Sequence, residues 1–224
     1  MRSDDLPLSE ARGHYIIIGG TLMEKHLTVP FEYDQLQALR AGDYIYLTGT
    51  IYSARDAAHK RMYDAILAAE EKDKEVQSYN GTDLYNKDIL PFDIMGNTIY
   101  YLGPTPAKPG QVIGSAGPTT SSRMDKYTPL LLSKGLKGMI GKGKRSQAVI
   151  DAIVENKAVY MAAVGGAGAL LSKCIKESEI IAYDDLGTEA IRKMRVENFP
   201  CIVVIDSEGN NLYETAVGEY INGR

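Results

Sequence analysis

The sequence predicts an α/β fold: a single compact domain around a partly parallel, mixed sheet. From residue 111 onward, strand-like runs, glycine-containing loops and helical segments of about a dozen residues follow one another repeatedly. Strands that alternate with such helices are typical of parallel strands covered by helices. No linker rich in Pro, Gly or Ser divides the chain, which favours one domain over two.

In the first half of the chain, paired strands with fewer helices are expected. Two runs rich in β-branched residues and tyrosine, 15–23 and 43–53, predict strands. A short helix that ends at Gly42 is expected between them. Residues 55–73 are Ala-rich with an apolar face at helical spacing, so they predict a helix. Residues 97–110 predict a strand that continues into a Pro/Gly loop.

Four strand–loop–helix units are expected in the second half. The strand-like runs are residues 111–117, 136–143, 158–166 and 179–185. The helices that follow them are residues 125–135, 145–157, 167–177 and 188–196. The last strand begins at residue 201 and is expected to end in a hairpin over residues 208–210.

The composition is that of a globular protein and excludes several classes of partner. The chain has 224 residues, of which 44% are hydrophobic and 24% charged, and a net charge of −4. This balance gives no global attraction to nucleic acid or to an anionic membrane. No apolar run approaches the roughly 20 residues that span a bilayer. Residues 1–14 lack the apolar core of a signal peptide. They are interpreted as a polar extension before a domain at 15–224, and a cytoplasmic location is expected.

The chain offers no set of metal ligands. Cys174 and Cys201 lie far apart in apolar surroundings and are expected to be small buried hydrophobes. Two thiolates cannot hold a complete Cys-ligated iron–sulfur cluster or a structural zinc ion. The histidines, His14, His26 and His59, are scattered. No metal site is therefore expected on this chain.

The segment GSAGPTTSSRMD, residues 114–125, gives the most specific functional signal. Thr119 and Thr120 precede Arg123 and are expected at the start of a helix, where free backbone N–H groups favour an anion. The planar fork of Arg123 matches a carboxylate. The alternative is a threonine N-cap beside a solvated arginine.

A second junction, GTIYSARDAAHKR at residues 49–61, places a cation at the start of a helix. Arg55 and His59 are four residues apart and can share one helix face. Asp56 in the first turn complements the helix dipole. The alternative is an exposed capped helix with a basic side.

A third junction, GMIGKGKRS at residues 138–146, holds Lys142 between two glycines. Residues 138–144 fit the front of a phosphate-binding loop, but Arg145 stands where such a loop has the magnesium-ligating Ser or Thr. The preferred interpretation is a tight turn that lets the Lys142 ammonium approach a ligand.

Together the junctions predict a site for a small dianion. Arg55, Arg123 and Lys142 each follow a predicted strand, and ligands of α/β sheets bind at the carboxyl ends of strands. Arginine forks suit a dicarboxylate. A hydroxyl of Thr119 or Thr120 could move a proton at the carbon between the carboxylates, although threonine is a poor base and needs a neighbouring group to accept its proton.

Five stretches carry a resemblance to a known family. They are GDYIYLTGTIYSARDAAHKR, YYLGPTPAKPGQVIGSAGPTTSSRMDKYTP, GMIGKG, VYMAAVGGAGALL and DDLGTEAIRKMRVENFPCIVVIDSEGNNLY. Together they resemble the β subunit of class I fumarate hydratase, equivalent to the C-terminal domain of its single-chain forms. The β subunit of L(+)-tartrate dehydratase is a close sibling. The resemblance runs from about residue 20 to about residue 215, and ARDAAH and GPTTSSRMD are its most specific motifs.

The resemblance implies a swivelling β/β/α domain and the reversible hydration of fumarate to L-malate, a step of the tricarboxylic acid cycle. It implies an α subunit that carries a 4Fe–4S cluster, with the active site between the subunits, and a higher oligomer of αβ pairs. By resemblance, Arg55, Arg123 and Lys142 bind substrate. Thr119 transfers the proton, helped by an aspartate of the α subunit, and Thr120 lies beside it.

Three functions stay open at this point. The first is the fumarase β subunit, with Asp56 and His59 as supporting residues. The second is the β subunit of tartrate dehydratase, which differs only in substrate. The third is a non-catalytic module that binds a dicarboxylate or another anion. The sequence also leaves open which of Thr119 and Thr120 transfers the proton.

Overall fold

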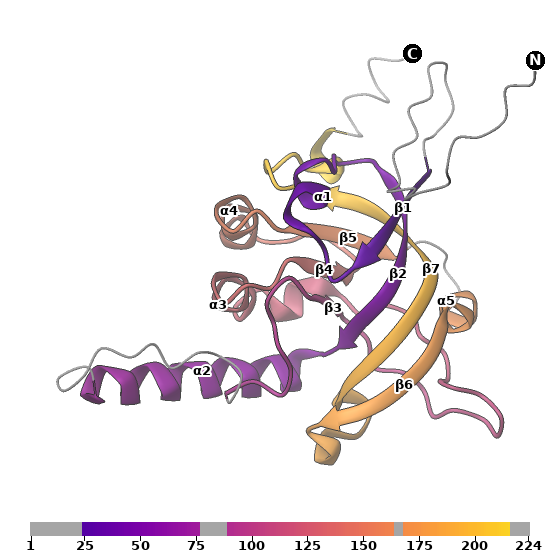
Figure 1. Ribbon diagram of the computed structural model, residues 1–224, viewed down its shortest axis with the longest axis horizontal. Helices are drawn as coiled ribbons and strands as arrows, with labels where there is room; N and C mark the ends of the chain where they lie inside the picture. The colour runs from indigo at the N-terminus through magenta and orange to yellow at the C-terminus, as the bar shows by residue number, and fades with distance from the viewer. Residues whose placement is uncertain (1–23, 77–88, 164–167, 216–224) are drawn as a thin grey trace, which may run out of the picture.

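The computed structural model describes residues 24–76, 89–163 and 168–215. The expected strand at 15–23 and the polar extension at 1–14 lie outside these residues. Figure 1 shows a sheet in the middle of the molecule with a long helix that extends away from it. Within the described residues, no helix is both long and apolar enough to cross a membrane.

In the part of the chain that the structure describes, seven strands form one mixed sheet. They are β1 (Glu24–Val29), β2 (Tyr44–Ser53), β3 (Thr98–Tyr100), β4 (Gly138–Gly141), β5 (Val159–Ala163), β6 (Ile175–Ala182) and β7 (Ile191–Ile205). Strands β1 to β5 are parallel neighbours in that order. Strand β7 runs antiparallel to both β5 and β2, which closes β2, β3, β4, β5 and β7 into a ring. Strand β1 extends the sheet from β2, and β6 extends it from β7.

Within the described ranges, five α-helices and two 3₁₀ turns accompany the sheet. They are α1 (Tyr33–Gln37), α2 (Asp56–Val76), α3 (Thr128–Ser133), α4 (Gln147–Glu155), α5 (Gly168–Cys174), η2 (Ser121–Met124) and η3 (Asp184–Glu189). Helices α2, α3 and α4 lie on one side of the ring, and α5 lies on the side of β6 (Figure 1). The predicted α/β class and the mixed, partly parallel sheet are confirmed.

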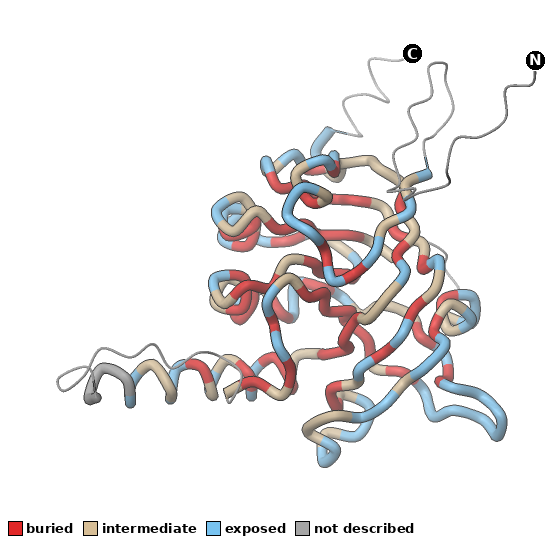
Figure 2. Tube along the Cα trace, in the orientation of Figure 1, coloured by how far each residue is buried: buried red, intermediate tan, exposed pale blue. Residues whose placement is uncertain are grey.

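Alternation along the ring strands divides the apolar residues between two cores. Within residues 99–102, Tyr100 and Leu102 belong to one core cluster, to which all five ring strands contribute residues. Ile99 and Tyr101 belong to the other cluster, which includes residues of the helices. Both faces of β3 and β4 are therefore buried, whereas β2 and β7 also carry exposed and half-buried positions (Figure 2). A strand buried on both faces carries a continuous apolar run, which explains why this segment lacks a polar–apolar alternation.

The predicted helix at residues 188–196 is wrong. Most of this segment belongs to β7, which pairs with β2 on one edge and with β6 on the other. The apolar residues Ile191 and Met194 are three apart, as on a helix face, but pairing on both edges satisfies the backbone as a strand.

The predicted strand at residues 111–117 is also wrong. The segment has no strand structure and adjoins only an isolated bridge between Leu102 and Pro118. Glycines at 114 and 117 interrupt the short apolar run. The Tyr100 hydroxyl donates to the Ala116 carbonyl at 2.6 Å and anchors this loop to β3.

Strand β1 and the turn η3 were not predicted, whereas most of the other elements follow the prediction with shifted ends. Helix α3 covers less than the expected 125–135, because residues 121–127 form η2 and a turn, but the chain leaves it at Gly135 with a φ of 104° as expected. The helix expected at 167–177 ends at Cys174, where β6 begins. The turn after β7 is built around the Asp206 carboxylate and has only an isolated bridge, not a second strand.

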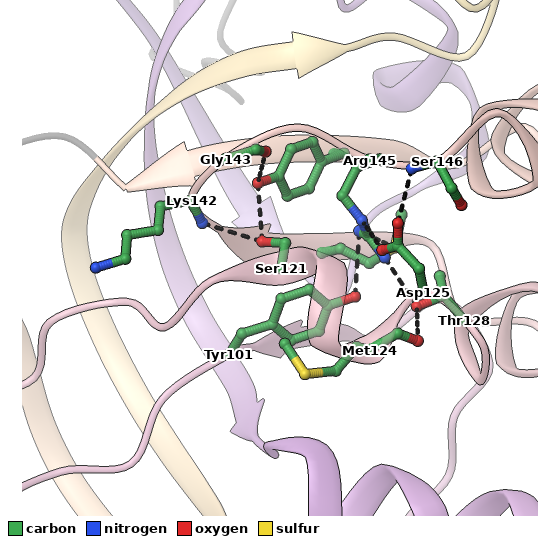
Figure 3. Close-up of polar contacts among 11 residues, drawn as sticks. Tyr101, Ser121, Met124, Asp125, Thr128, Lys142, Gly143, Arg145 and Ser146 are labelled. Carbon is green, nitrogen blue, oxygen red and sulfur yellow. Dashed lines mark hydrogen bonds and ion pairs between the residues drawn. The ribbon is translucent and has the colours of Figure 1, made fainter.

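A buried ion pair joins two loops at the carboxyl ends of the parallel strands (Figure 3). The Arg145 side chain is fully buried, and its Nε donates to Asp125 Oδ1 at 2.7 Å. Asp125 Oδ2 accepts from the backbone N–H of Ser146 at 2.7 Å. Arg145 Nη2 donates to the Thr128 hydroxyl at 2.8 Å. The pair therefore fixes the β4–α4 loop to the turn between η2 and α3.

Two tyrosines enclose the same guanidinium. Arg145 Cζ lies 5.4 Å from the ring centroid of Tyr101 and 5.0 Å from that of Tyr160. The Tyr160 hydroxyl lies 2.8 Å from Ser121 Oγ, which accepts from the Lys142 backbone N–H at 3.0 Å. Ion pairing, hydrogen bonds and aromatic faces thus compensate the cost of burying this charge.

We expect Arg145→Met to lower the free energy of unfolding by about 3 kcal/mol or more, because it leaves the Asp125 carboxylate without its partner. Urea unfolding followed by circular dichroism measures this value. The control is Arg61→Met, which breaks the exposed ion pair with Asp185 and should cost about 1 kcal/mol or less. Equal losses for the two variants would contradict the role assigned to the buried pair.

His59 on α2 is buried in the core behind the strand ends. Its Nδ1 lies 2.9 Å from the Arg55 carbonyl and donates to it, and its ring meets Tyr101 edge-to-face at 5.2 Å. Its Nε2 is buried and has no hydrogen-bond partner among the described residues. Burial lowers the pKa of His59 to about 4, and nearby Arg145 acts in the same direction.

This lowered pKa predicts a loss of stability in acid. The unfolded chain binds a proton at His59 near its ordinary pKa of about 6.5, whereas the folded chain does so only near 4. The contribution of neutral His59 to the free energy of unfolding is therefore complete above pH 6.5. It disappears as the pH falls toward 4, which is a loss of about 3 kcal/mol. We expect His59→Phe to remove this part of the pH dependence in urea unfolding from pH 7 to pH 4. His26→Phe on exposed β1 should leave it unchanged; equal slopes in wild type and His59→Phe would contradict the assignment.

Candidate functional site

Three neighbouring parallel strands end at one edge of the sheet, and the predicted residues Arg55 and Lys142 lie just after two of these strand ends. Arg55 follows β2, the loop that contains Gly103 follows β3, and Lys142 follows β4. The segment that carries the threonines is docked to the same edge, because the Thr119 backbone N–H donates to the Tyr101 carbonyl at 2.8 Å. This is the arrangement expected for ligand sites of α/β sheets.

Arg55 and Arg123, 68 positions apart in the chain, share one carboxylate. Arg123 Nη2 donates to Asp56 Oδ2 at 2.9 Å. Arg55 Nε lies 3.8 Å from Asp56 Oδ1, and neither of these two buried atoms has a hydrogen-bond partner among the described residues. The structure thus brings the two predicted arginines to opposite oxygens of one carboxylate.

A second carboxylate, Glu189, belongs to the same cluster and was not predicted from the sequence. Its Oε1 lies 3.3 Å from Arg55 Nη2. Its Oε2 accepts from the backbone N–H of Ala57 at 3.0 Å, in the first turn of α2. Glu189 lies at the end of η3, in a segment predicted as the start of a helix, so no local signal connected it with Arg55.

The predicted threonines and lysine form a neighbouring group. Thr120 and Lys142 are paired in an isolated parallel bridge, and the Ser121 N–H donates to the Lys142 carbonyl at 2.9 Å. The Lys142 side chain is exposed and points away from the Arg145 cluster (Figure 3). Thr119 is half-buried and Thr120 is exposed.

The expected helix start at the threonines is a short turn. Thr120 occupies the N-cap of η2, a four-residue 3₁₀ turn, and its side chain makes no capping hydrogen bond. Among the described residues, neither threonine hydroxyl has a hydrogen-bond partner. The capping alternative therefore does not account for these hydroxyls.

An open depression of about 410 Å³ lies over the arginine cluster. It is lined by Asp56, Ala57, Lys60, Arg123, Lys126, Tyr127 and Glu189. Three cationic and two anionic side chains meet here, so the local charge is positive although the chain is acidic overall. Such a surface favours a small anion by local rather than global electrostatics. The other predicted residues, Arg55, Thr119, Thr120 and Lys142, are not part of its lining, and His59 is buried in the core.

The residues present do not fit an iron–sulfur cluster. The Cys201 side chain is sealed in the core inside the ring, and burial raises the pKa of its thiol. The Cys174 thiol is half-buried and lies 3.8 Å from the Leu170 carbonyl. Across the residues that the structure describes, no group of three or more His, Cys, Asp or Glu side chains is placed to hold a metal ion.

Comparison with known proteins identifies a family and relatives of this chain. The model of the family described as fumarase C-terminus matches residues 21–86 and 79–216. The chain is 37% identical over 187 residues to the anaerobic class I fumarate hydratase of Escherichia coli K12, covering 83% of this chain and 31% of that protein. It is 36% identical over 181 residues to fumarate hydratase 2 of Leishmania major, covering 80% and 29%.

A third relative has about the length of this chain. The putative L(+)-tartrate dehydratase subunit beta of Methanocaldococcus jannaschii is 35% identical over 185 residues, covering 80% of this chain and 86% of that protein. The chain thus spans about a third of the fumarate hydratases but most of this subunit. On the family match and these relatives together, the chain belongs to the fumarase C-terminal family.

Proposed function

We propose that this chain is the β subunit of a class I fumarate hydratase, a hydro-lyase that reversibly converts fumarate to L-malate. One observation carries the proposal: Arg55 and Arg123 lie at opposite oxygens of the Asp56 carboxylate, at 3.8 Å and 2.9 Å. A pair of arginines that already accommodates a carboxylate is suited to binding a substrate carboxylate in its place. The domain would be the swivelling β/β/α domain of this cytoplasmic enzyme.

The proposal assigns each residue a part. Arg55 and Arg123 bind the dicarboxylate, and Lys142 adds a positive charge from the neighbouring loop. The Thr119 hydroxyl gives its proton to one carbon of the double bond as a water oxygen adds to the other. A carboxylate outside the described residues accepts the proton that this water loses and returns a proton to the Thr119 oxygen. In the reverse direction the same oxygen removes the proton from L-malate. Thr120 helps to orient the substrate beside it.

The proposal requires a partner. A 4Fe–4S cluster would have to be carried by an α subunit, since the thiols of this chain are not placed to hold it. The fumarate hydratase relatives are about three times as long as the matched region. An α subunit would supply the remainder, and αβ pairs would assemble into a higher oligomer.

A second candidate is the β subunit of L(+)-tartrate dehydratase. The specific observation in its favour is the 35% identity to the relative that bears this name, of which the alignment covers 86%. The same arginines would bind the carboxylates of tartrate. Contacts to the two hydroxyl groups of tartrate would then decide between the substrates.

The test uses this chain assembled anaerobically with its α subunit, sought first in the neighbouring reading frame. We expect the complex to hydrate fumarate, seen as loss of absorbance, and the chain alone to be inactive. Arg123→Lys should lower kcat/KM by about 30-fold or more, because an ammonium cannot replace a planar fork.

Matched controls make this test decisive. Arg61→Lys, an equivalent change at an exposed arginine of α2, should leave kcat/KM within about twofold of wild type. Turnover by the chain alone would refute the two-subunit proposal. Dehydration of L(+)-tartrate without hydration of fumarate would select the second candidate.

Thr119→Val separates proton transfer from folding, because valine has nearly the volume of threonine without its hydroxyl. If Thr119 transfers the proton, kcat falls by about 100-fold or more while KM changes less. Thr120→Val is the internal control, and melting temperatures of both variants report on stability. A variant of Thr119 with normal kcat would contradict the assignment, and a loss confined to Thr120 would move the role to its neighbour.

A further inference from the structure

Glu189 connects Arg55 to the start of α2. One carboxylate oxygen lies 3.3 Å from Arg55 Nη2, and the other accepts from the Ala57 backbone N–H at 3.0 Å. Ala57 directly follows the Arg55–Asp56 pair in the chain. The Glu189 carboxylate therefore contacts the backbone next to Arg55 and also the Arg55 guanidinium. These two contacts restrict the Arg55 side chain near its base and at its tip.

The opposite side of Arg55 is restricted by Gly103. A Cβ atom added at this glycine would lie 2.7 Å from both Cδ and Nη1 of Arg55 and 3.3 Å from the Thr188 carbonyl oxygen. These distances are too short for a methyl group beside an undisturbed arginine. The backbone of the β3 loop and the η3 turn thus enclose the guanidinium between them.

Within this enclosure, the Nε donor of Arg55 is left without a hydrogen-bond partner among the described residues. Nη2 contacts Glu189, whereas Nε is buried and lies 3.8 Å from Asp56 Oδ1. A ligand carboxylate that replaces Asp56 would meet an Nε donor whose direction is already fixed. A preorganised donor binds more tightly than one that must first be ordered.

We propose that Glu189 is a positioning residue for Arg55. It orients the Arg55 side chain so that Nε can donate a hydrogen bond to a substrate carboxylate that takes the place of Asp56. Gly103 has no side chain and so leaves room for Arg55 in this orientation. This role rests on the proposed function for its substrate, a small dicarboxylate. Glu189 also neutralises one arginine, which lets Arg55 and Arg123 lie close together around a single carboxylate. Glu189 does not contact the reacting carbons in this arrangement.

The competing explanation is that Glu189 only caps α2. Glu189→Gln distinguishes the two, because the amide oxygen can still accept from the Ala57 N–H while the charge next to Arg55 is removed. A purely structural role would leave substrate binding intact in this variant. A positioning role would change binding while the melting temperature stays close to that of wild type.

The kinetic test uses the complex with the α subunit and fumarate as substrate. We expect Glu189→Gln to raise KM by about 10-fold with kcat within about threefold of wild type, since it weakens carboxylate binding rather than the chemical step. The control is Glu179→Gln on exposed β6. In an Arg55→Ala background the same Glu189→Gln change should have almost no further effect. The proposal would be overturned if Glu189→Gln left KM unchanged. It would also be overturned if Glu189→Gln raised KM by the same factor in the Arg55→Ala background as in wild type.

A second measurement separates this inference from the proposed function. The Arg55 Nε–H signal in ¹H–¹⁵N spectra of the full chain is assigned by its loss in Arg55→Lys. Glu189→Gln should shift this signal, and a titration with L-malate should require about tenfold more ligand in the variant than in wild type. If the complex does not hydrate fumarate but both effects occur, the function fails and the positioning role stands. An unshifted signal would overturn the positioning role itself.

Discussion

The buried ion pair between Arg145 and Asp125 is the constraint on which the site depends. It joins the β4–α4 loop, which presents Lys142, to the turn after η2, which carries Arg123. Both loops leave the sheet at the same edge, where the Ser121 N–H also donates to the Lys142 carbonyl and the buried pair adds a side-chain contact. Because the pair is enclosed by Tyr101 and Tyr160, it is shielded from the solvent screening that weakens exposed pairs.

A second constraint is the repulsion between two neighbouring arginines. Arg55 and Arg123 can lie together only because Asp56 and Glu189 supply negative charge between and beside them. An anion that enters the depression therefore has to replace a carboxylate, not fill an uncompensated positive pocket. A site in which a ligand carboxylate replaces a protein carboxylate selects for carboxylate geometry more strongly than a cluster of unpaired cations would.

The sequence predicted those parts of the site that are local in the chain. ARDAAH placed Arg55 and Asp56 at a helix start, and GPTTSSRMD placed Arg123 after the threonines, because strand, loop and helix signals lie within a few residues. Contacts between distant segments carried no such signal. Glu189 reaches Arg55 only because η3 packs against α2. Arg145 was interpreted as a departure from a phosphate-binding loop, and its burial depends on Asp125 and two tyrosines from other strands.

The same limit explains the two errors in the fold. Strand β7 pairs on both edges, so long-range hydrogen bonds outweighed the helix-like spacing of Ile191 and Met194. Residues 111–117 show the reverse, since a strand-like run makes only an isolated bridge where it ends at Pro118.

Ion pairing between carboxylates and arginines also bears on the chemistry of the site. Asp56 and Glu189, the carboxylates that line the depression, both contact arginines, and Thr119 does not line the depression with them. The chemistry proposed here therefore needs a base from another surface, and the open side of the depression is where a partner could bring one.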